Sequence, residues 1–276
     1  MRADLHIHSV FSDGKMTVEE IAKRVKDSGI DIFALTDHDT MNGVQAAAKA
    51  AKAEGVLFVP GIEISADNGV KIHVLGYGCD PESEAFQAFL QNRIKKAILR
   101  TEDSIAKLAK VGIHISLEDV EAFHVKKEEP LHAMQIAKAI RAKGYRYQSD
   151  KDAYRQCVAP SAPGYSDADK LSAEEAVEII VQSGGFASLA HPGRIALEEE
   201  PKERLIASLC DHGLGGIEAV YTLHTEEETA GYRGLAQKYG LLVTGGSDTH
   251  MLRGKRIIGL PTFVPDEKLL LALHIL

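Results

Sequence analysis

The sequence predicts an α/β fold, a distorted βα barrel of about seven strands whose two halves flank a helical insertion. Two observations predict it. Strand and helix patterns alternate through the first 80 residues and again after about residue 170, and the segment between is charged and helix-rich. A repeated β–α–β order implies a mostly parallel sheet, open or closed into a barrel. We therefore predict a barrel of residues 1–82 and 171–276 and an inserted lid of residues 83–170.

The first half supplies four of the predicted strands. Thr17 and Glu20 have the spacing of a capping box, which predicts a helix that includes residues 21–29. Asp67, Asn68 and Gly69 form a turn signal that joins the third and fourth strands. The predicted strands cover residues 3–8, 31–36, 56–65 and 71–77, and an alanine-rich helix covers residues 42–55.

Alternation returns after the insertion. A predicted helix over residues 172–185 leads into a strand that starts at Phe186 and runs into a loop. The remaining pattern predicts a helix over 201–213, a strand over 216–221, a helix over 225–240 and a strand with its loop over 241–250.

Composition limits the kind of protein this is. The chain has 276 residues, 45% of them hydrophobic and 26% charged, which is ordinary for a globular protein with a buried core. A net charge of −8 argues against binding of long DNA. Cys79, Cys157 and Cys210 show no CxxC pairing and are typical of reduced thiols. Without a basic leader or an apolar run of about 18 residues, we expect a cytoplasmic protein with no membrane segment. No pattern in the sequence indicates an obligate protein partner.

Metal-capable side chains first gather in "DLHIHSVFSDG", residues 4–14. Side chains two apart in a strand share a face, so His6 and His8 point the same way while Leu5 and Ile7 pack on the other side. Asp13 follows in the loop, where Gly14 permits a tight turn. Two histidines at the end of a strand are a bidentate clamp for a metal ion.

Four further segments place histidine or carboxylate at strand ends. "TDHDT" brings Asp37, His38 and Asp39 to the mouth of the sheet, although Asp39 or Thr40 has the alternative role of capping the next helix. Glu63 and His73 each stand between two apolar residues of a strand, where an unpaired charge is costly. The last two segments are "SLAHPGR", with His191 and Arg194, and "VTGGSDTH", with Asp248 and His250.

These residues form a ligand set that is too large for one ion. It suits two or three divalent ions with a bridging carboxylate, and the absence of cysteine from the set favours Mn²⁺, Fe²⁺ or Zn²⁺, with Mn²⁺ preferred. The nine candidate ligands are His6, His8, Asp13, His38, Glu63, His73, His191, Asp248 and His250.

The motifs resemble those of the polymerase-and-histidinol-phosphatase (PHP) family of metallophosphoesterases. The matching segments are "DLHIHSVFSDG", "ALTDHDT", "GIEIS" with "IHVLGY", "LAHPGR" and "GIEAVY…LLVTGGSDTH", in the order of the family. The resemblance is closest to the stand-alone branch with a helical insertion, whose members are 3′,5′-nucleotide bisphosphate phosphatases or 5′-to-3′ exoribonucleases. It implies a distorted seven-stranded barrel and a trinuclear metal centre.

Carried over residue by residue, the resemblance implies three ligand groups. One ion would take His6, His8, Glu63 and Asp248. A second would share Glu63 and add His73 and His191. A third would take Asp13, His38 and His250.

Candidates for holding substrate come partly from the sequence itself and partly from the resemblance. Arg194 is the candidate for a phosphate contact, because its planar guanidinium follows a ligand turn. In the insertion, His132 and Tyr165 are further candidates, but Pro130 stands where the family usually has arginine. Lys126, Lys127 and Lys138 are alternatives there, although such a charge run is usually a solvated helix face. Asp37, Asp39 and His224 are predicted to orient ligands or substrate.

The expected activity is hydrolysis of phosphate esters by metal-activated hydroxide. The expected substrates are adenosine 3′,5′-bisphosphate and similar nucleotides, or short RNA ends with a 5′-phosphate. One alternative within the hydrolases is a histidinol-phosphate phosphatase. An alternative of another class is a non-catalytic module that binds metal or nucleotide.

Overall fold

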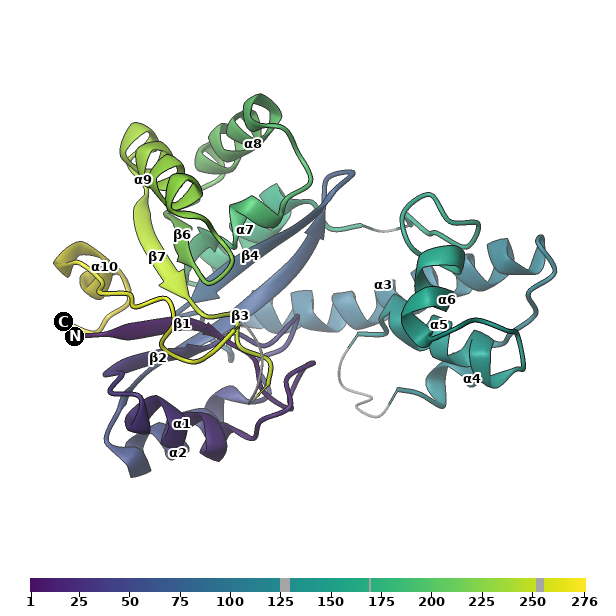
Figure 1. The fold of residues 1–276 in the computed structure, drawn as a ribbon, viewed down its shortest axis with the longest axis horizontal. Helices are drawn as coiled ribbons and strands as arrows, with labels where there is room; N and C mark the ends of the chain where they lie inside the picture. Colours follow the sequence, from purple (N-terminus) through teal and green to yellow (C-terminus); the bar gives the residue numbers. More distant parts are fainter. Residues whose placement is uncertain (125–129, 169, 252–255) are drawn as a thin grey trace. The chain divides into compact units, whose positions relative to one another are not determined.

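The computed structural model of the protein describes residues 1–124, 130–168, 170–251 and 256–276 (Figure 1). The chain forms two compact units, one of residues 1–87 and 171–276 and the other of residues 88–170. Lys126 and Lys127 lie outside the described residues.

The first unit contains a nearly closed barrel, as predicted. Within the described residues, seven strands form one sheet in chain order, and four of the six neighbouring pairs are parallel. The amide of His8 donates to the carbonyl of Thr249 over 3.0 Å and that of Asp248 to His6 over 2.7 Å, which joins the two edges. The strands are β1 (Ala3–Ile7), β2 (Ile32–Leu35), β3 (Leu57–Asp67), β4 (Lys71–Tyr77), β5 (Phe186–Leu189), β6 (Gly216–Tyr221) and β7 (Leu242–Gly246).

One strand of the barrel runs against the others. The turn at Asp67–Gly69 reverses the chain, so β4 is antiparallel to β3 and, on its other side, to β5. A residue near the beginning of β4 therefore lies at the barrel end where the other strands finish. His73 is such a residue, and it pairs with Ser65 of β3.

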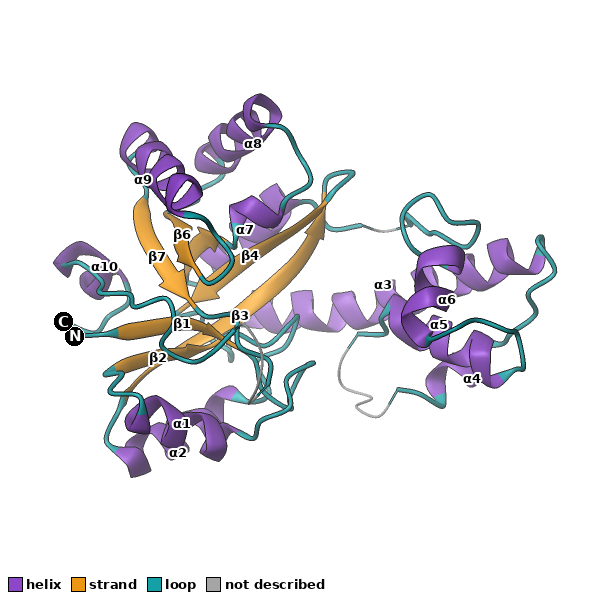
Figure 2. Cartoon of the chain, viewed as in Figure 1, coloured by secondary structure: helices purple, strands orange, loops and turns teal. Residues whose placement is uncertain are grey.

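Helices of this unit lie outside the barrel (Figure 2). The first begins at the predicted capping box, where the Glu20 amide donates to Thr17 Oγ1 and the Thr17 amide donates to Glu20 Oε2. A short 3₁₀ turn, η1 (Pro192–Arg194), follows β5. The helices are α1 (Val18–Asp27), α2 (Val44–Glu54), α7 (Ala173–Gln182), α8 (Glu199–Asp211), α9 (Glu226–Tyr239) and α10 (Glu267–Ala272).

Two apolar clusters hold the barrel unit together. Leu5 packs with residues of the other strands and of α10, and this cluster fills the barrel interior. Ile7 belongs to a second cluster, in which β1 and β2 pack against α1 and α2. Both side chains are fully buried, as predicted, but they serve different clusters because the pairing of β1 with β2 shifts register between Asp4 and Ile7.

The second unit is helical, with its own core of residues such as Leu108, Val120, Ile136 and Ile140. Among the described residues of the whole chain, no helix is both long and apolar enough to cross a membrane. The helices of this unit are most of α3 (Glu84–Ala109), then α4 (Leu117–Glu121), α5 (Ala133–Ala142) and α6 (Asp150–Cys157). His132 caps the start of α5, and Tyr165 follows α6.

Candidate metal centre

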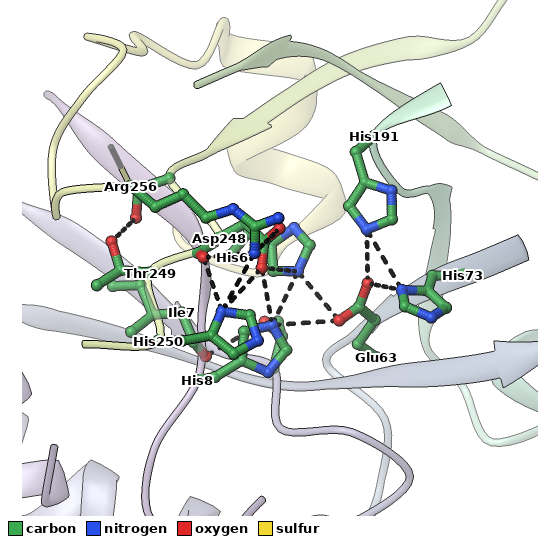
Figure 3. Close-up of polar contacts among 12 residues, drawn as sticks. His6, Ile7, His8, Glu63, His73, His191, Asp248, Thr249, His250 and Arg256 are labelled. Carbon is green, nitrogen blue, oxygen red and sulfur yellow. Dashed lines mark hydrogen bonds and ion pairs between the residues drawn. The ribbon is translucent and has the colours of Figure 1, made fainter. Parts of the chain in front are cut away.

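All nine predicted ligands come together at one end of the barrel. β1 supplies His6 and, just beyond its end, His8, while the segments after β2, β5 and β7 supply further ligands. Glu63 comes from the middle of β3 and His73 from the beginning of the reversed strand β4. Figure 3 shows most of these side chains turned toward one another.

Glu63 is the centre of the cluster. Its Oε1 lies 2.6 Å from His73 Nδ1 and 3.0 Å from His191 Nε2. Its Oε2 lies 3.1 to 3.2 Å from nitrogens of three further histidines, His6, His8 and His38. One buried carboxylate therefore touches five imidazoles, which is the arrangement expected of a bridging ligand.

His6, His8, Glu63 and Asp248 form one compact group of donor atoms. His6 Nε2 and His8 Nε2 are 3.1 Å apart, and their distances to Asp248 Oδ1 are 3.7 and 3.3 Å. Both lie 3.1 to 3.2 Å from Glu63 Oε2. A tetrahedral ion with ligands at about 2.1 Å separates neighbouring ligand atoms by about 3.4 Å. The spacing of these donors fits an ion of that kind.

A second gathering of donors lies at the outer side of the cluster. His250 Nε2 is 3.2 Å from Asp13 Oδ1, and His8 Nδ1 is 3.8 Å from the same oxygen. His8, Asp13, His38 and His250 are close enough together to bind one ion. His38 is also close enough to share an ion with Glu63 and His73.

Some donors in the cluster have no hydrogen bond within the described residues. Glu63 Oε2, His8 Nδ1 and His38 Nδ1 are buried and unsatisfied in this way. Buried polar atoms without hydrogen bonds are rare in proteins and need an explanation, of which a bound ion is one. The donor set of imidazoles and carboxylates also fits borderline divalent ions. The residues present therefore fit a metal centre of the kind that the sequence predicts.

The protonation of the metal-free cluster follows from its charges. Burial by itself lowers the pKa of His8, but its close contacts with the carboxylates of Asp248 and Glu63 outweigh burial and raise the pKa to about 9. Burial lowers the pKa of His38 to about 3. Although burial opposes it, His6 and His8 hold the pKa of Asp248 well below its usual range. Without metal, the cluster thus combines ionised carboxylates with protonated His8.

Three non-glycine residues with positive φ lie in or beside the cluster. They are Asp39 at 52°, His191 at 27° and Asp248 at 53°. Such backbone conformations are uncommon outside glycine and concentrate at functional sites, where the surrounding structure holds them. His191 and Asp248 are themselves candidate ligands.

Two of the predicted supporting residues fix loops of the centre. Asp37 is buried and accepts hydrogen bonds from the Ser9 amide, the Ser9 hydroxyl and the Ser12 hydroxyl, which ties down the segment before Asp13. Asp39 accepts from the Ser65 amide and so joins the loop after β2 to β3.

His224 supports the turn that follows His191. Its Nε2 accepts from the Gly193 amide over 3.2 Å, and its Nδ1 donates to the Ala219 carbonyl over 3.1 Å. Both ring nitrogens of this neutral tautomer therefore have a hydrogen-bond partner. The bond to Gly193 fixes His224 against the turn that carries Arg194.

His132 and Tyr165 belong to the second compact unit, so their proposed contact with substrate stays a prediction. The Tyr165 hydroxyl accepts from Lys170, and its carbonyl accepts from Lys107 over 3.0 Å, both within that unit.

A cavity of about 220 Å³ opens onto the centre and carries three cationic side chains. Arg194 lines it, as expected for a phosphate contact. Lys71 and Arg256 also line it and were not predicted from the sequence. Arg256 Nη1 lies 2.8 Å from Asp248 Oδ2, and the Tyr221 hydroxyl donates to the same oxygen over 2.9 Å. The other oxygen of Asp248 is left facing the histidines.

Two buried carboxylates of the site were also missed. Asp4 accepts hydrogen bonds from the amides of Ser247 and Gly259. Glu218 in β6 contacts both His6 and His191. Glu218 stands between two apolar residues in "GIEAVY", the signal that identified Glu63, so the sequence did contain the means to find it.

Position 14 has no room for a side chain, so glycine is required there. A Cβ there would lie 2.5 Å from the His8 carbonyl oxygen. We expect Gly14→Ala to lower the free energy of unfolding by about 1–3 kcal/mol, because the loop must move away from His8. Urea denaturation measures this. The control is Gly231→Ala in the exposed part of α9, where a Cβ meets nothing within 4 Å and stability should not fall. Equal stability of the two variants would contradict the close-approach explanation.

The barrel and its cluster of histidines and carboxylates define the class of metal-dependent hydrolases. The chain belongs to the PHP domain family, whose model matches residues 4–212. This confirms the family inferred from the motifs.

Relatives in this family act on phosphate esters. The chain is 32% identical to a phosphoribosyl 1,2-cyclic phosphate 1,2-diphosphodiesterase of Eggerthella lenta, over 91% of this chain and 94% of that protein. It is also 32% identical to a 3′,5′-nucleoside bisphosphate phosphatase of Chromobacterium violaceum, over 90% and 86%. Identity to a 5′-3′ exoribonuclease of Salmonella typhimurium is 28%, over 90% and 84%.

A solved structure has the same fold. An amidohydrolase from Chromobacterium violaceum, solved with sulfate and without metal, superposes with a TM-score of 0.78 at 30% identity. The match covers 97% of this chain and 93% of the other. The predicted barrel with its helical insertion is therefore confirmed.

Proposed function

We propose that this protein is a metal-dependent phosphoesterase that removes phosphate from small phosphorylated nucleotides, with 3′,5′-bisphosphates as the preferred substrates. One observation carries the proposal: seven of the nine metal-capable side chains line a cavity that also presents Lys71, Arg194 and Arg256. Metal ligands beside cations are what a phosphoryl group needs on its several oxygens. We keep the prediction that the protein acts in the cytoplasm.

The proposed centre holds two or three divalent ions, with Mn²⁺ as the first choice. His6, His8, Glu63 and Asp248 would hold one ion, and Glu63, His73 and His191 a second. Asp13, His38 and His250 would hold a third, and the position of His8 adds it to this group. Bound divalent ions supply a nucleophile from water at neutral pH and offset charge on the phosphoryl group.

The chain's own residues bind and orient the substrate. Arg194 follows the turn after His191, and its guanidinium can take two phosphoryl oxygens at once. Lys71 adds a positive charge from the beginning of β4. Tyr221 and Arg256 hold Asp248 in one orientation by binding its outer oxygen. A cavity of about 220 Å³ is small beside the usual range of about 300–1,000 Å³ for ligand sites, so it suits the phosphate-bearing end of a nucleotide.

A second candidate substrate is a cyclic phosphodiester of a phosphorylated sugar. The diphosphodiesterase of Eggerthella lenta favours it, because that relative matches across nearly the whole of both chains. Both substrates place a phosphoryl group beside a second anionic group, so the three cations suit either. An RNA end with a 5′-phosphate is the third arm of the test, and histidinol phosphate the fourth.

The test is product formation by protein stripped with a chelator and then loaded with Mn²⁺. Phosphate release is measured for the monoesters, and chromatography detects the opened cyclic diester and the nucleotides trimmed from RNA. Adenosine 3′,5′-bisphosphate, ribose 1,2-cyclic phosphate 5-phosphate, a 5′-phosphorylated RNA oligomer and histidinol phosphate are compared side by side. We expect metal-dependent turnover, fastest with the bisphosphate. Preference for the cyclic diester would replace the substrate while keeping the enzyme class. No turnover of any of the four by metal-loaded protein would favour the non-catalytic module.

Metal uptake should depend on pH. Since the pKa of metal-free His8 is about 9, an ion that binds its Nε2 must displace a proton at pH 7. Affinity should therefore rise with pH up to about 9, by about tenfold per pH unit for each proton displaced. Calorimetric titration of metal-free protein at pH 7, in buffers of different ionisation enthalpy, counts the protons released. Release should decline at pH 9.5, and its absence at pH 7 would contradict the prediction.

A further inference from the structure

We propose that Glu218 is a positioning residue of the metal centre, which holds His6 and His191 so that both present a ring nitrogen to the ions. The inference rests on the proposed function, because it takes these histidines as metal ligands. Glu218 lies in β6 between Ile217 and Ala219, and all three side chains are completely buried. A buried carboxylate is tolerated where hydrogen bonds use its oxygens.

Each oxygen of Glu218 is used by a different ligand residue. Oε1 lies 2.9 Å from His6 Nδ1, and Oε2 accepts the backbone N–H of His191 over 2.7 Å. The two ligands come from distant parts of the chain, the end of β1 and the turn after β5. With Glu63, they form one group of donors that could hold an ion.

The contact with His6 selects the tautomer of its ring. A carboxylate acceptor beside Nδ1 places the proton on that nitrogen, which leaves the lone pair on Nε2. His6 Nε2 is the atom that faces His8 Nε2, Glu63 Oε2 and Asp248 Oδ1. The hydrogen bond to Glu218 thus turns the metal-binding nitrogen toward the other donors.

The contact with His191 acts through the backbone. His191 has φ of 27° and ψ of 62°, where the chain leaves β5 and enters η1. The hydrogen bond from its N–H to Glu218 holds this uncommon conformation, and the side chain then reaches Glu63 Oε1 with Nε2 at 3.0 Å. One carboxylate therefore sets the position of two ligands.

Glu218→Gln tests this role. The amide keeps one acceptor oxygen, so it can serve His6 or His191 but not both, and its N–H₂ group repels the other donor. Metal-free protein is dialysed against graded Mn²⁺, and bound metal is measured by mass spectrometry. We expect the ions that depend on His6 and His191 to bind about 10–100-fold more weakly. Glu175→Gln, the same change in the capping box of α7, is the control and should bind as wild type.

Unchanged metal number and affinity in folded Glu218→Gln would overturn the proposal. A second measurement needs no variant, should Glu218→Gln fail to fold. In Zn²⁺-loaded wild-type protein with ¹⁵N-labelled histidine, His6 should carry its proton on Nδ1 and show slow exchange of that proton with water. A proton on Nε2, or a rapidly exchanging one on Nδ1, would overturn the assignment. Because both readouts are independent of turnover, failure of the phosphoesterase assay leaves them interpretable.

Discussion

Replacing Glu63 by glutamine is expected to lower kcat/KM at least about 1,000-fold, which corresponds to about 4 kcal/mol of transition-state stabilisation. Glu63 is the residue whose two oxygens face five histidines, so it is the proposed bridge between ions. An amide has one acceptor oxygen, carries no charge and directs N–H groups at the neighbouring nitrogens. Bound metal, measured alongside turnover of the bisphosphate, should fall as well.

Two results decide the interpretation of Glu63. Glu19→Gln makes the same chemical change in the exposed first turn of α1 and should leave turnover unchanged. If Glu63→Gln kept a tenth of wild-type activity with its full metal content, the bridging role would be wrong.

Asp13→Ala is expected to remove the outer ion while leaving the fold intact. The Asp13 side chain is 58% exposed, so its loss should change stability little, whereas its Oδ1 faces His250 Nε2 at 3.2 Å. We expect turnover to fall about 100-fold or more, because a divalent cation beside the phosphoryl group is lost. Metal content should fall by one ion, while the group around His6 keeps its own.

The control for Asp13→Ala is Asp211→Ala, at the exposed end of α8. Its turnover and metal content should equal those of the wild-type protein. Hydrolysis at the wild-type rate by Asp13→Ala would leave the third ion without a role in the reaction. Loss of every ion would instead mean that the groups bind cooperatively.

Much of the site was predictable because side chains alternate along a strand, so the spacing of two residues in the sequence shows whether they lie on the same face. His6 and His8 do face the same way, and Glu63, isolated among apolar residues, does lie at the centre. The same reasoning reaches two residues that were missed. Glu218, like Glu63, stands between two apolar residues of a strand. Lys71 lies two residues before His73 in β4, and both side chains line the cavity.

Other features could not be derived from local pattern. Arg256 reaches Asp248 from a loop with no periodicity, so nothing in the spacing indicates the contact. The antiparallel pairing of β4 with β5 joins segments about a hundred residues apart, where tertiary packing decides the partner. α10 is too short for a helical period to show, and it forms because Leu269, Leu270 and Leu273 close the barrel core.

The pairing of β4 with β5 has a consequence for how this protein family diversifies. Tyr77 at the end of β4 pairs with Phe186 at the start of β5, so everything between them is, in topology, the loop of a β-hairpin. Loop closure costs only about 0.6 kcal/mol for each doubling of length. Evolution can therefore extend, trim or exchange this loop without rebuilding the barrel. The helical segment becomes a replaceable part, while the candidate metal ligands stay with the strands and the loops beside them.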